Sequence, residues 1–310
     1  MTTENQKALR GSLMLLFIAI IWGAAFVAQR AGMNHIGPFA FNGIRMLLGG
    51  LVMIPVVRLL DRKTPDEVRR APERIRDQRI AGLLCGIFLF IASSLQQVGL
   101  VTTSAGKAGF ITALYVVLVS VAGLLIFHIH PGKMIWAGVG LAVVALYLLC
   151  IPASGFQVES GDLLVIGCAL CFTAQILVID RYAARVNGAA LARDEFFITG
   201  ALSMIIALFT EKIAWEGIRE AMIPILYTGI LSSAVGYTLQ IFGQRDVNPT
   251  LASLLMCLES VFAVFIGALI LGERMSLREG IGCVLMFSAV ILAQISPVLS
   301  AKRKKKAAGR

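Results

Sequence analysis

Residues 11–29 read GSLMLLFIAIIWGAAFVAQ, a continuous apolar run without a charged side chain. A helix needs roughly 20 mostly apolar residues to cross a bilayer, so this run is long enough to span it once. It is too long for the apolar core of a cleaved signal peptide, which takes about 7–15 residues, and a second apolar run follows almost at once at 38–59. We therefore expect a polytopic membrane protein that keeps its N-terminus.

The composition of the whole chain agrees with this reading. Its 310 residues are 58% hydrophobic and only 15% charged, against roughly 45–50% and about 25% in soluble proteins. The apolar residues suffice for about nine or ten spans of roughly 20 residues each. The net charge of +10 does not indicate a nucleic-acid partner, because the basic residues lie in loops between apolar runs, as expected beside a lipid bilayer.

Ten apolar runs are candidate spans, five on each side of a polar patch at 152–159. The runs are 11–29, 38–59, 80–100, 103–127 and 134–151, followed by 161–180, 196–210, 221–242, 249–271 and 277–295. The seventh of them is the shortest. The sequence therefore predicts an all-α polytopic membrane protein with ten transmembrane helices.

The basic residues predict how the chain is oriented. With a cytoplasmic N-terminus, 21 of the 28 lysine and arginine residues fall on the cytoplasmic side, six on the opposite side, and Arg45 inside a span. Cytoplasmic loops of membrane proteins carry an excess of these residues. We expect both termini in the cytoplasm and the patch 152–159 on the opposite face. The basic loop 62–79 and the tail 302–306 are interpreted as topology signals that contact lipid headgroups.

The two sets of five spans can be laid over each other with modest slippage. Five glycine pairs then coincide: Gly11 with Gly161, Gly49 with Gly200, Gly86 with Gly229, Gly123 with Gly267, and Gly138 with Gly282. Because five is odd, the second copy must enter the membrane from the opposite side, which gives inverted repeats. The expected organisation is a repeat at 1–151, a second at 160–297 and a basic cytoplasmic tail at 298–310, with a substrate site at the midplane.

Several short motifs carry a family resemblance. They are Trp22-Gly23 in the first span, Arg45 in the second, Gly109-Phe110 through Leu114-Tyr115 in the fourth, Leu258-Glu259-Ser260-Val261-Phe262-Ala263 in the ninth, and Leu271-Gly272-Glu273-Arg274 at its end. With them the chain resembles the EamA-type drug/metabolite transporters over nearly its whole length. Two departures are Ser260 and the region of Ser120, where relatives often carry proline, so helix bends there are left open.

The resemblance implies two five-helix repeats, cytoplasmic termini and an exporter in a bacterial inner (plasma) membrane. It also implies a central cavity flanked mainly by spans one, three, four, six, eight and nine. On this basis Trp22 and Tyr115 are expected to line the cavity rather than face lipid.

Three charged residues lie at least one helical turn inside predicted spans: Arg45, Lys107 and Glu259. A central charge costs roughly 2.5–3.5 kcal/mol on insertion scales, so such residues usually face a cavity or a partner. One interpretation is an internal ion pair that holds the repeats together; the other is a role in substrate or proton binding. Two cations would favour anionic or zwitterionic substrates, and Glu259 is the candidate for proton coupling because a carboxyl group at this depth resists ionisation.

Uncharged amides add hydrogen-bonding capacity at membrane depth, which suits polar or zwitterionic metabolites. The amides are Gln96, Gln97, Gln175 and Gln240. The expected substrate-binding residues are Trp22, Arg45, Gln97, Lys107, Tyr115, Gln175, Gln240 and Glu259.

No catalytic, metal or cofactor site is indicated. The six cysteines all lie in apolar spans, where a thiol packs as a small residue, and the pair Cys168 and Cys171 has neither a βαβ context nor a second pair. His35, His128 and His130 lie at span ends without a cluster that completes a ligand set. The phosphate-binding pattern G-x-x-x-x-G-K-[ST] is missing from the sequence, so ATP hydrolysis is not expected.

The function expected from the sequence is secondary transport: export of small amino-acid-like or amphipathic metabolites by alternating access. Its partners are a small-molecule substrate and the bilayer, with a homodimer left open. An intramembrane lipid-modifying enzyme is the first alternative, but it needs an array such as D-x-x-D or H-x-x-H, which the sequence lacks. A solute channel is the second, and selectivity for divalent cations would need converging carboxylates where only Glu259 is central.

Overall fold

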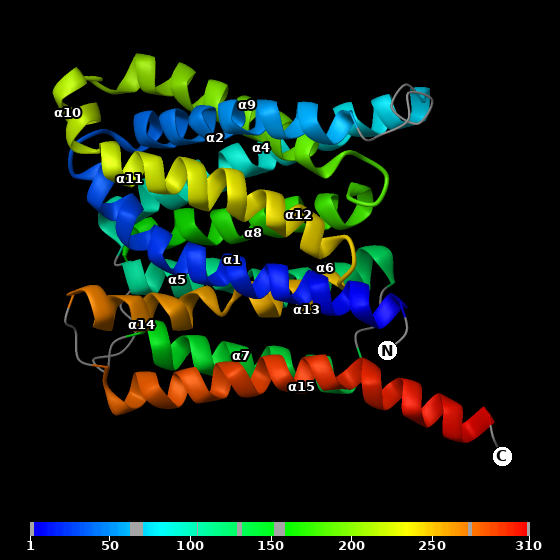
Figure 1. Ribbon diagram of the computed structural model, residues 1–310. Helices are drawn as coiled ribbons and strands as arrows, with labels where there is room; N and C mark the ends of the chain where they lie inside the picture. The colour runs from blue at the N-terminus through cyan, green and yellow to red at the C-terminus, as the bar shows by residue number, and fades with distance from the viewer. Residues whose placement is uncertain are drawn as a thin grey trace.

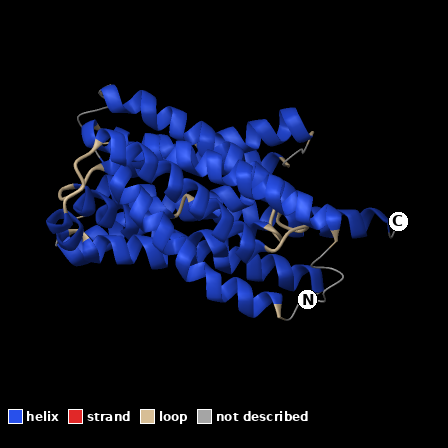
Figure 2. Cartoon of the chain, turned by 90° about the horizontal axis from the view of Figure 1, so that it is seen from above, coloured by secondary structure: helices blue, strands red, loops and turns tan. Residues whose placement is uncertain are grey.

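The computed structural model describes residues 3–62, 71–103, 105–128, 132–151, 159–271 and 275–308. These residues form helices laid side by side in one bundle, without a strand among them (Figure 1, Figure 2). The first half contains α1 (Thr3–Met33), α2 (Pro38–Asp61), α4 (Pro72–Thr102), α5 (Ala105–Ala113), α6 (Tyr115–Phe127) and α7 (Lys133–Cys150). The second contains α8 (Ser160–Tyr182), α9 (Gly188–Thr210), α10 (Trp215–Glu220), α11 (Met222–Leu226), η1 (Tyr227–Tyr237), α12 (Thr238–Gln244), α13 (Pro249–Met256), α14 (Glu259–Leu271) and α15 (Leu277–Ala308).

Within the described residues, eight helical stretches are long and apolar enough to cross a membrane. This confirms the predicted class, an all-α polytopic membrane protein, whereas the count of ten spans stays a prediction. The stretch at α9 is not one of the eight, because its first half carries Arg193, Asp194 and Glu195. Only part of the side chains of α15 belong to the described structure.

The helix that contains the seventh predicted span begins before it. We expected it at 196–210, but α9 begins at Gly188, where the Asn187 side chain accepts hydrogen bonds from the amides of Ala189 and Ala190. An asparagine cap of this kind satisfies amide groups that the first turn leaves free. The charged residues that follow made this turn resemble a loop, yet they continue the helix.

Two predicted spans are broken near their middle, one in each half of the chain. The fourth divides at Leu114 into α5 and α6, and the ninth divides at Cys257–Leu258 into α13 and α14. At both breaks an amide bonds three residues back instead of four: Leu114 to Ile111 and Leu258 to Leu255. Neither break contains a proline. The breaks precede the two positions at which the sequence left bends open: α6 continues through Ser120 and α14 through Ser260.

The eighth predicted span contains η1, a π-helix of 11 residues between α11 and α12. Such wide turns are rare and often lie at functional sites. Here η1 is tied to α1 by two side chains. Trp22 Nε1 donates to the carbonyl oxygen of Ser232 at 3.1 Å, and the Tyr227 hydroxyl donates to the carbonyl oxygen of Ile21 at 2.8 Å.

The packing of the helices is nearly unchanged when the two halves are exchanged. Helix α2 packs along α9, and α7 packs along α15. Helix α4 packs against α8, and its counterparts η1 and α12 pack against α1 in the same way. Helices α5 and α6 contact α8, and their counterparts α13 and α14 contact α1. This pattern is what an approximate two-fold axis between the two halves of the chain produces.

Matched glycines occupy matched contacts in this arrangement. A Cβ on Gly11 would lie 2.8 Å from the carbonyl oxygen of Gly243, and one on Gly161 would lie 2.5 Å from that of Gly99. The first contact joins α1 to α12 and the second joins α8 to α4, which are equivalent under the exchange. Glycine therefore lets helix backbones approach closely at corresponding points of both halves.

Loop residues also connect the halves. The carboxylate of Glu211, directly after α9, accepts hydrogen bonds of 2.8 Å from the amides of Phe39 and Ala40 in the first turn of α2. One half of the chain thus caps a helix of the other.

Buried apolar side chains form two large clusters, one around α1, α6, α7, α13 and α15, and one around α2, α4, α8, α9 and η1. Trp22 packs against both clusters. Trp22 therefore lies where the two clusters meet.

The start of α1 and the end of α15 lie at the same end of the bundle (Figure 1). The patch 152–159, apart from Glu159, and the tail side chains at 302–306 lie outside the described residues.

We expect single cysteines at Ser154 and Ser300, in a chain without its six native cysteines, to react with an impermeant thiol reagent from opposite sides of the membrane. Labelling of both from one side would contradict the ten-span topology.

Candidate functional site: a central cavity between the two halves

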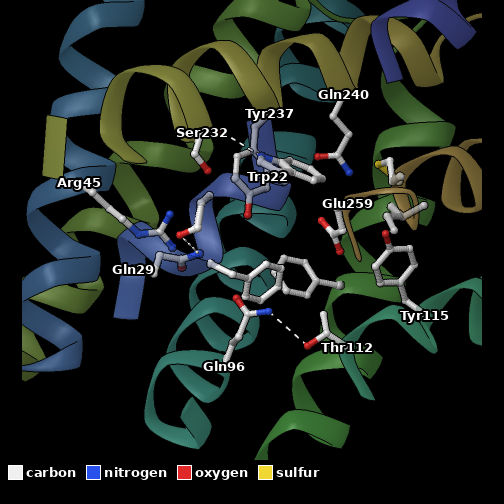
Figure 3. A pocket seen from close by; sticks show the side chains of 15 residues that line it. Trp22, Gln29, Arg45, Gln96, Thr112, Tyr115, Ser232, Tyr237, Gln240 and Glu259 are labelled. Atoms are coloured by element: carbon white, nitrogen blue, oxygen red, sulfur yellow. Dashed lines mark hydrogen bonds between the residues drawn. The ribbon is translucent and has the colours of Figure 1, made fainter. Parts of the chain in front are cut away.

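A cavity of about 50 Å³, partly open to the outside, lies between helices of both halves of the chain (Figure 3). The lining residues are Trp22, Ala25, Phe26, Gln29, Arg45, Gln96, Thr112, Tyr115, Phe172, Ile176, Ser232, Tyr237, Gln240, Met256 and Glu259. They come from α1, α2, α4, α5, α6 and α8, and from η1, α12, α13 and α14. Both halves therefore build the cavity, and α2 joins the six spans that the resemblance implied.

Among these lining residues Arg45 is the single cation and Glu259 the single carboxylate. Figure 3 shows the two side chains entering the cavity from opposite sides. No ion pair joins them in the described structure, so the interpretation of an Arg45–Glu259 pair that only holds the repeats together is not supported. The cavity instead presents opposite charges at two separate walls.

Arg45 is held in place by neutral groups. Its Nε and Nη2 donate to Asn42 Oδ1 at 3.2 and 2.8 Å, and Asn42 Nδ2 donates to the hydroxyls of Ser93 and Ser203 at 2.9 Å each. The guanidinium group has five N–H donors. Asn42 takes two of them, so donors remain for a group inside the cavity.

Glu259 is the first residue of α14, directly after the break in the ninth predicted span. Its side chain is 5% exposed and has no hydrogen-bond partner among the described residues. The break ends α13 just before this position and lets the carboxyl group face the cavity. A buried carboxyl group without a partner is suited to bind a cation or a proton.

Aromatic side chains form one wall. The rings of Trp22 and Tyr237 lie 5.0 Å apart at 54°, and Tyr237 meets Phe196 edge-on at 5.9 Å. Tyr115, at the start of α6, lines the cavity with its hydroxyl group buried beside the Cys257 thiol. These rings give the site an apolar surface between its two charges.

Two of the four expected glutamines line the cavity, and the other two lie behind the residues that line it. Gln240 lines the cavity, as does Gln96, which donates to Thr112 Oγ1 at 3.2 Å. Gln97 lies behind the wall and donates to Gln29 Oε1 at 2.8 Å. Gln175 is also behind the wall, buried between Glu195 and Gln240.

The structure therefore brings five of the eight expected residues to the cavity: Trp22, Arg45, Tyr115, Gln240 and Glu259. Gln97 and Gln175 contact it through other amides. The side chain of Lys107 lies outside the described residues, so its expected role stays a prediction.

The sequence reasoning missed Gln29, Tyr237 and the fully buried Glu195. A signal for Glu195 was present, because Glu195, Thr199 and Ser203 recur every four residues and so share one helix face. All three side chains have no exposed area. A metal-binding group of three or more histidine, cysteine, aspartate or glutamate residues is not found in the part of the chain that was placed.

Comparison with known proteins identifies the fold and a protein family. Residues 9–151 and 159–294 each match the model of the EamA-like transporter family. An uncharacterized transporter of Archaeoglobus fulgidus is 31% identical over 292 residues, which cover 94% of this chain and 88% of that protein.

More distant relatives share the whole length. The uncharacterized inner membrane transporter YedA of Escherichia coli strain K12 is 21% identical over 290 residues, covering 93% of this chain and 91% of YedA. One crystal structure superposes with a TM-score of 0.77 at 18% identity, covering 94% of this chain and 97% of its own. This likeness shows a shared fold.

Proposed function

Because the chain belongs to the EamA-like transporter family, we propose that this membrane transporter exports amino-acid-like or amphipathic metabolites by alternating access. The observation that carries the proposal is the central cavity, which both halves line and which places Arg45 and Glu259 at opposite walls. A zwitterion can satisfy both charges at once, with its carboxylate at Arg45 and its ammonium group at Glu259. The rings of Trp22 and Tyr237 contact its apolar part.

The arrangement of the helices supports alternating access. We propose two inverted repeats, 1–151 and 160–297, that move relative to each other around the cavity. Broken helices at a midplane site, one per repeat, are a feature of transporters with inverted repeats. The breaks at Leu114 and Cys257–Leu258, one in each half of the chain, support this proposal. The contacts of Trp22 and Tyr227 between α1 and η1 cross from one repeat to the other.

The proposed location is a bacterial inner membrane with both termini in the cytoplasm and the basic tail 298–310 on the same side. The charge distribution of the loops supports this orientation. The relative YedA is an inner membrane transporter.

The proposal is tested by reconstitution into liposomes. A panel of amino acids, primary amines, carboxylates and neutral amphiphiles is measured for counterflow without a pH gradient and then with one imposed. We expect saturable counterflow of at least one zwitterionic class. Rates no higher than those of protein-free liposomes for every member would contradict the proposed function.

Arg45→Gln is expected to weaken counterflow of zwitterionic and anionic substrates at least tenfold more than that of neutral ones. Glutamine can still donate to Asn42, but it removes the charge that a carboxylate pairs with, and hydrogen bonds to charged groups contribute about 1.5–3 kcal/mol. The measurement is counterflow of the three classes at equal protein content. Arg45→Lys, which keeps the charge and loses the planar guanidinium group, is the matched control. Its counterflow of zwitterionic and anionic substrates should lie between that of the natural chain and that of Arg45→Gln. An equal fall for all three classes would assign Arg45 a structural role, and Lys107→Met tests the second expected cation in the same way.

A further inference from the structure

Glu195 is a fully buried carboxyl group that is not among the residues lining the cavity. It lies on α9 with no exposed area, and its Oε1 has no hydrogen-bond partner among the described residues. Arg193 nearby is paired with Asp194, at 2.6 Å from Nη2 to Oδ1. Keeping an unpaired charge at such a site is costly, so its presence calls for an explanation.

Two amides connect Glu195 to the cavity. Gln240 Nε2 donates to Gln175 Oε1 at 3.4 Å, and Gln175 Nε2 donates to Glu195 Oε2 at 3.3 Å. Gln240 itself lines the cavity, where Figure 3 shows it extending from α12 toward the site. Its Oε1 is buried without a described partner. The line of donors therefore runs from the cavity toward Glu195 and leaves a free acceptor at the cavity end.

The direction of this line depends on the proton of Glu195. An ionised carboxylate only accepts, which fixes the observed direction. A protonated carboxyl group can donate to Gln175. Because the oxygen and nitrogen of an amide have nearly the same shape, both amides can then rotate by half a turn without displacing other atoms. Gln240 would in that case present its Nε2 donor to the cavity in place of its Oε1 acceptor.

We propose that Glu195 is an intramembrane proton-binding site that sets, through Gln175 and Gln240, whether the cavity offers substrate a hydrogen-bond acceptor or a donor. One proton is bound or released at the carboxyl group, and each amide keeps its own hydrogens. The inference rests on the proposed function, because the ligand of Gln240 is taken to be the transported metabolite. An ionised Glu195 favours an ammonium group at Gln240, and a protonated one favours a carboxylate.

Few other titratable groups act on Glu195. Asp194 on α9, Cys85 on α4 and Tyr237 on η1 interact with it electrostatically. Helices α2, α8 and α12, which also surround it, add no further titratable group that interacts with it in the described structure. The proton site is thus linked to the cavity mainly by the two amides and by the Tyr237 ring.

The test measures the affinities of two probes of similar size, phenethylamine and phenylpropionate, for the full chain in lipid vesicles. Binding is followed by the fluorescence of Trp22 after Trp136→Phe and Trp215→Phe, which leave it as the sole tryptophan. Glu259→Gln is added so that the carboxyl group of the cavity cannot titrate. From about pH 9 to about pH 5, a range in which buried carboxyl groups titrate, we expect the preference for the amine over the carboxylate to fall roughly three- to tenfold.

In this background Glu195→Gln and Gln175→Leu should each remove the pH dependence of the preference. Asp194→Asn is the matched control: it removes a neighbouring carboxylate of the same helix but leaves the two amides in place, so the pH dependence should persist. A preference that does not change with pH before these substitutions, or that persists in Glu195→Gln, would overturn the inference. Loss of the pH dependence in Asp194→Asn as well would attribute it to net charge and overturn it too.

A second measurement needs no change to the cavity. The infrared difference spectrum of the natural chain between the same two pH values should contain a protonated carboxyl band that Glu195→Gln removes, and its absence would also count against the inference. The proposed transport function and the proposed role of Glu195 can fail separately. Without counterflow of any panel member the proposed function fails, whereas intact counterflow with a pH-independent probe preference leaves that function standing and rejects the role of Glu195.

Discussion

Liposomes containing Glu259→Gln are expected to exchange substrate across the membrane but not to accumulate it when a pH gradient is imposed. Glutamine keeps the shape of the side chain but cannot bind and release a proton. If one proton is exchanged per substrate, a gradient of about one pH unit sustains roughly tenfold accumulation. The variant should stay near the level without a gradient. The measurement is the ratio of internal to external labelled substrate, with counterflow recorded on the same vesicles.

Glu216→Gln is the matched control, because it makes the same substitution at an exposed position on α10. It should accumulate substrate like the natural chain. Full accumulation by Glu259→Gln would remove the residue from the coupling mechanism. Loss of thermal stability together with both activities would show a structural role, which is not expected since Glu259 has no described ion-pair partner.

Gly23→Ala is expected to destabilise the bundle by about 1–3 kcal/mol, the usual cost of overpacking, and Gly23→Leu to prevent its assembly. A Cβ at this position would lie 2.8 Å from each of three atoms of α14: the amide nitrogen of Ala263, the carbonyl oxygen of Glu259 and the Cβ of Phe262. Two of them are backbone atoms, which cannot rotate away. The added methyl group would push α1 from α14 at the cavity wall. Thermal unfolding of the protein in detergent measures the effect.

Gly109→Ala is the control for this substitution. Its Cβ would meet nothing within 4 Å, so the replacement should be neutral or stabilise the helix by up to about 1 kcal/mol. Equal losses in the two variants would show that the close approach of α1 and α14 does not decide stability.

The sequence predicted the course of the chain better than the rotation of its helices. Most helices begin within a few residues of the apolar runs, because a bilayer needs a fixed length of apolar residues. Rotation is set by packing between helices, which a single sequence does not display. Gln96 and Gln97 illustrate this: the first lines the cavity and the second lies behind Gln29. Among the matched glycines, Gly11 and Gly161 lie at equivalent contacts of the two halves, whereas a Cβ on Gly123 would meet nothing within 4 Å.

The breaks and the polar face of α9 were harder to predict for a different reason. Without proline, the breaks at Leu114 and Cys257–Leu258 have no local signal, since they arise from the packing of each half-helix against other spans. Glu195 was missed because Arg193 and Asp194 beside it made the segment look like a loop. The role proposed for Glu195 depends on Gln175, which contacts it, and on Gln240, which contacts Gln175. Both lie far from it in the chain and come close to it only in the folded bundle.

The charged first turns of α9 also have a consequence for biogenesis. On insertion scales a charged residue at mid-membrane costs roughly 2.5–3.5 kcal/mol, and the apolar part of this helix, 196–210, is short. Helix α2 stabilises this helix by packing against it, through the hydrogen bond of Asn42 to Ser203 and the close contact of Gly200 with Leu47. We therefore expect the segment 188–210 to be poorly recognised by the translocon alone and to insert beside α2, which is synthesised more than a hundred residues earlier. Stable insertion of the second half is then expected to depend on the first.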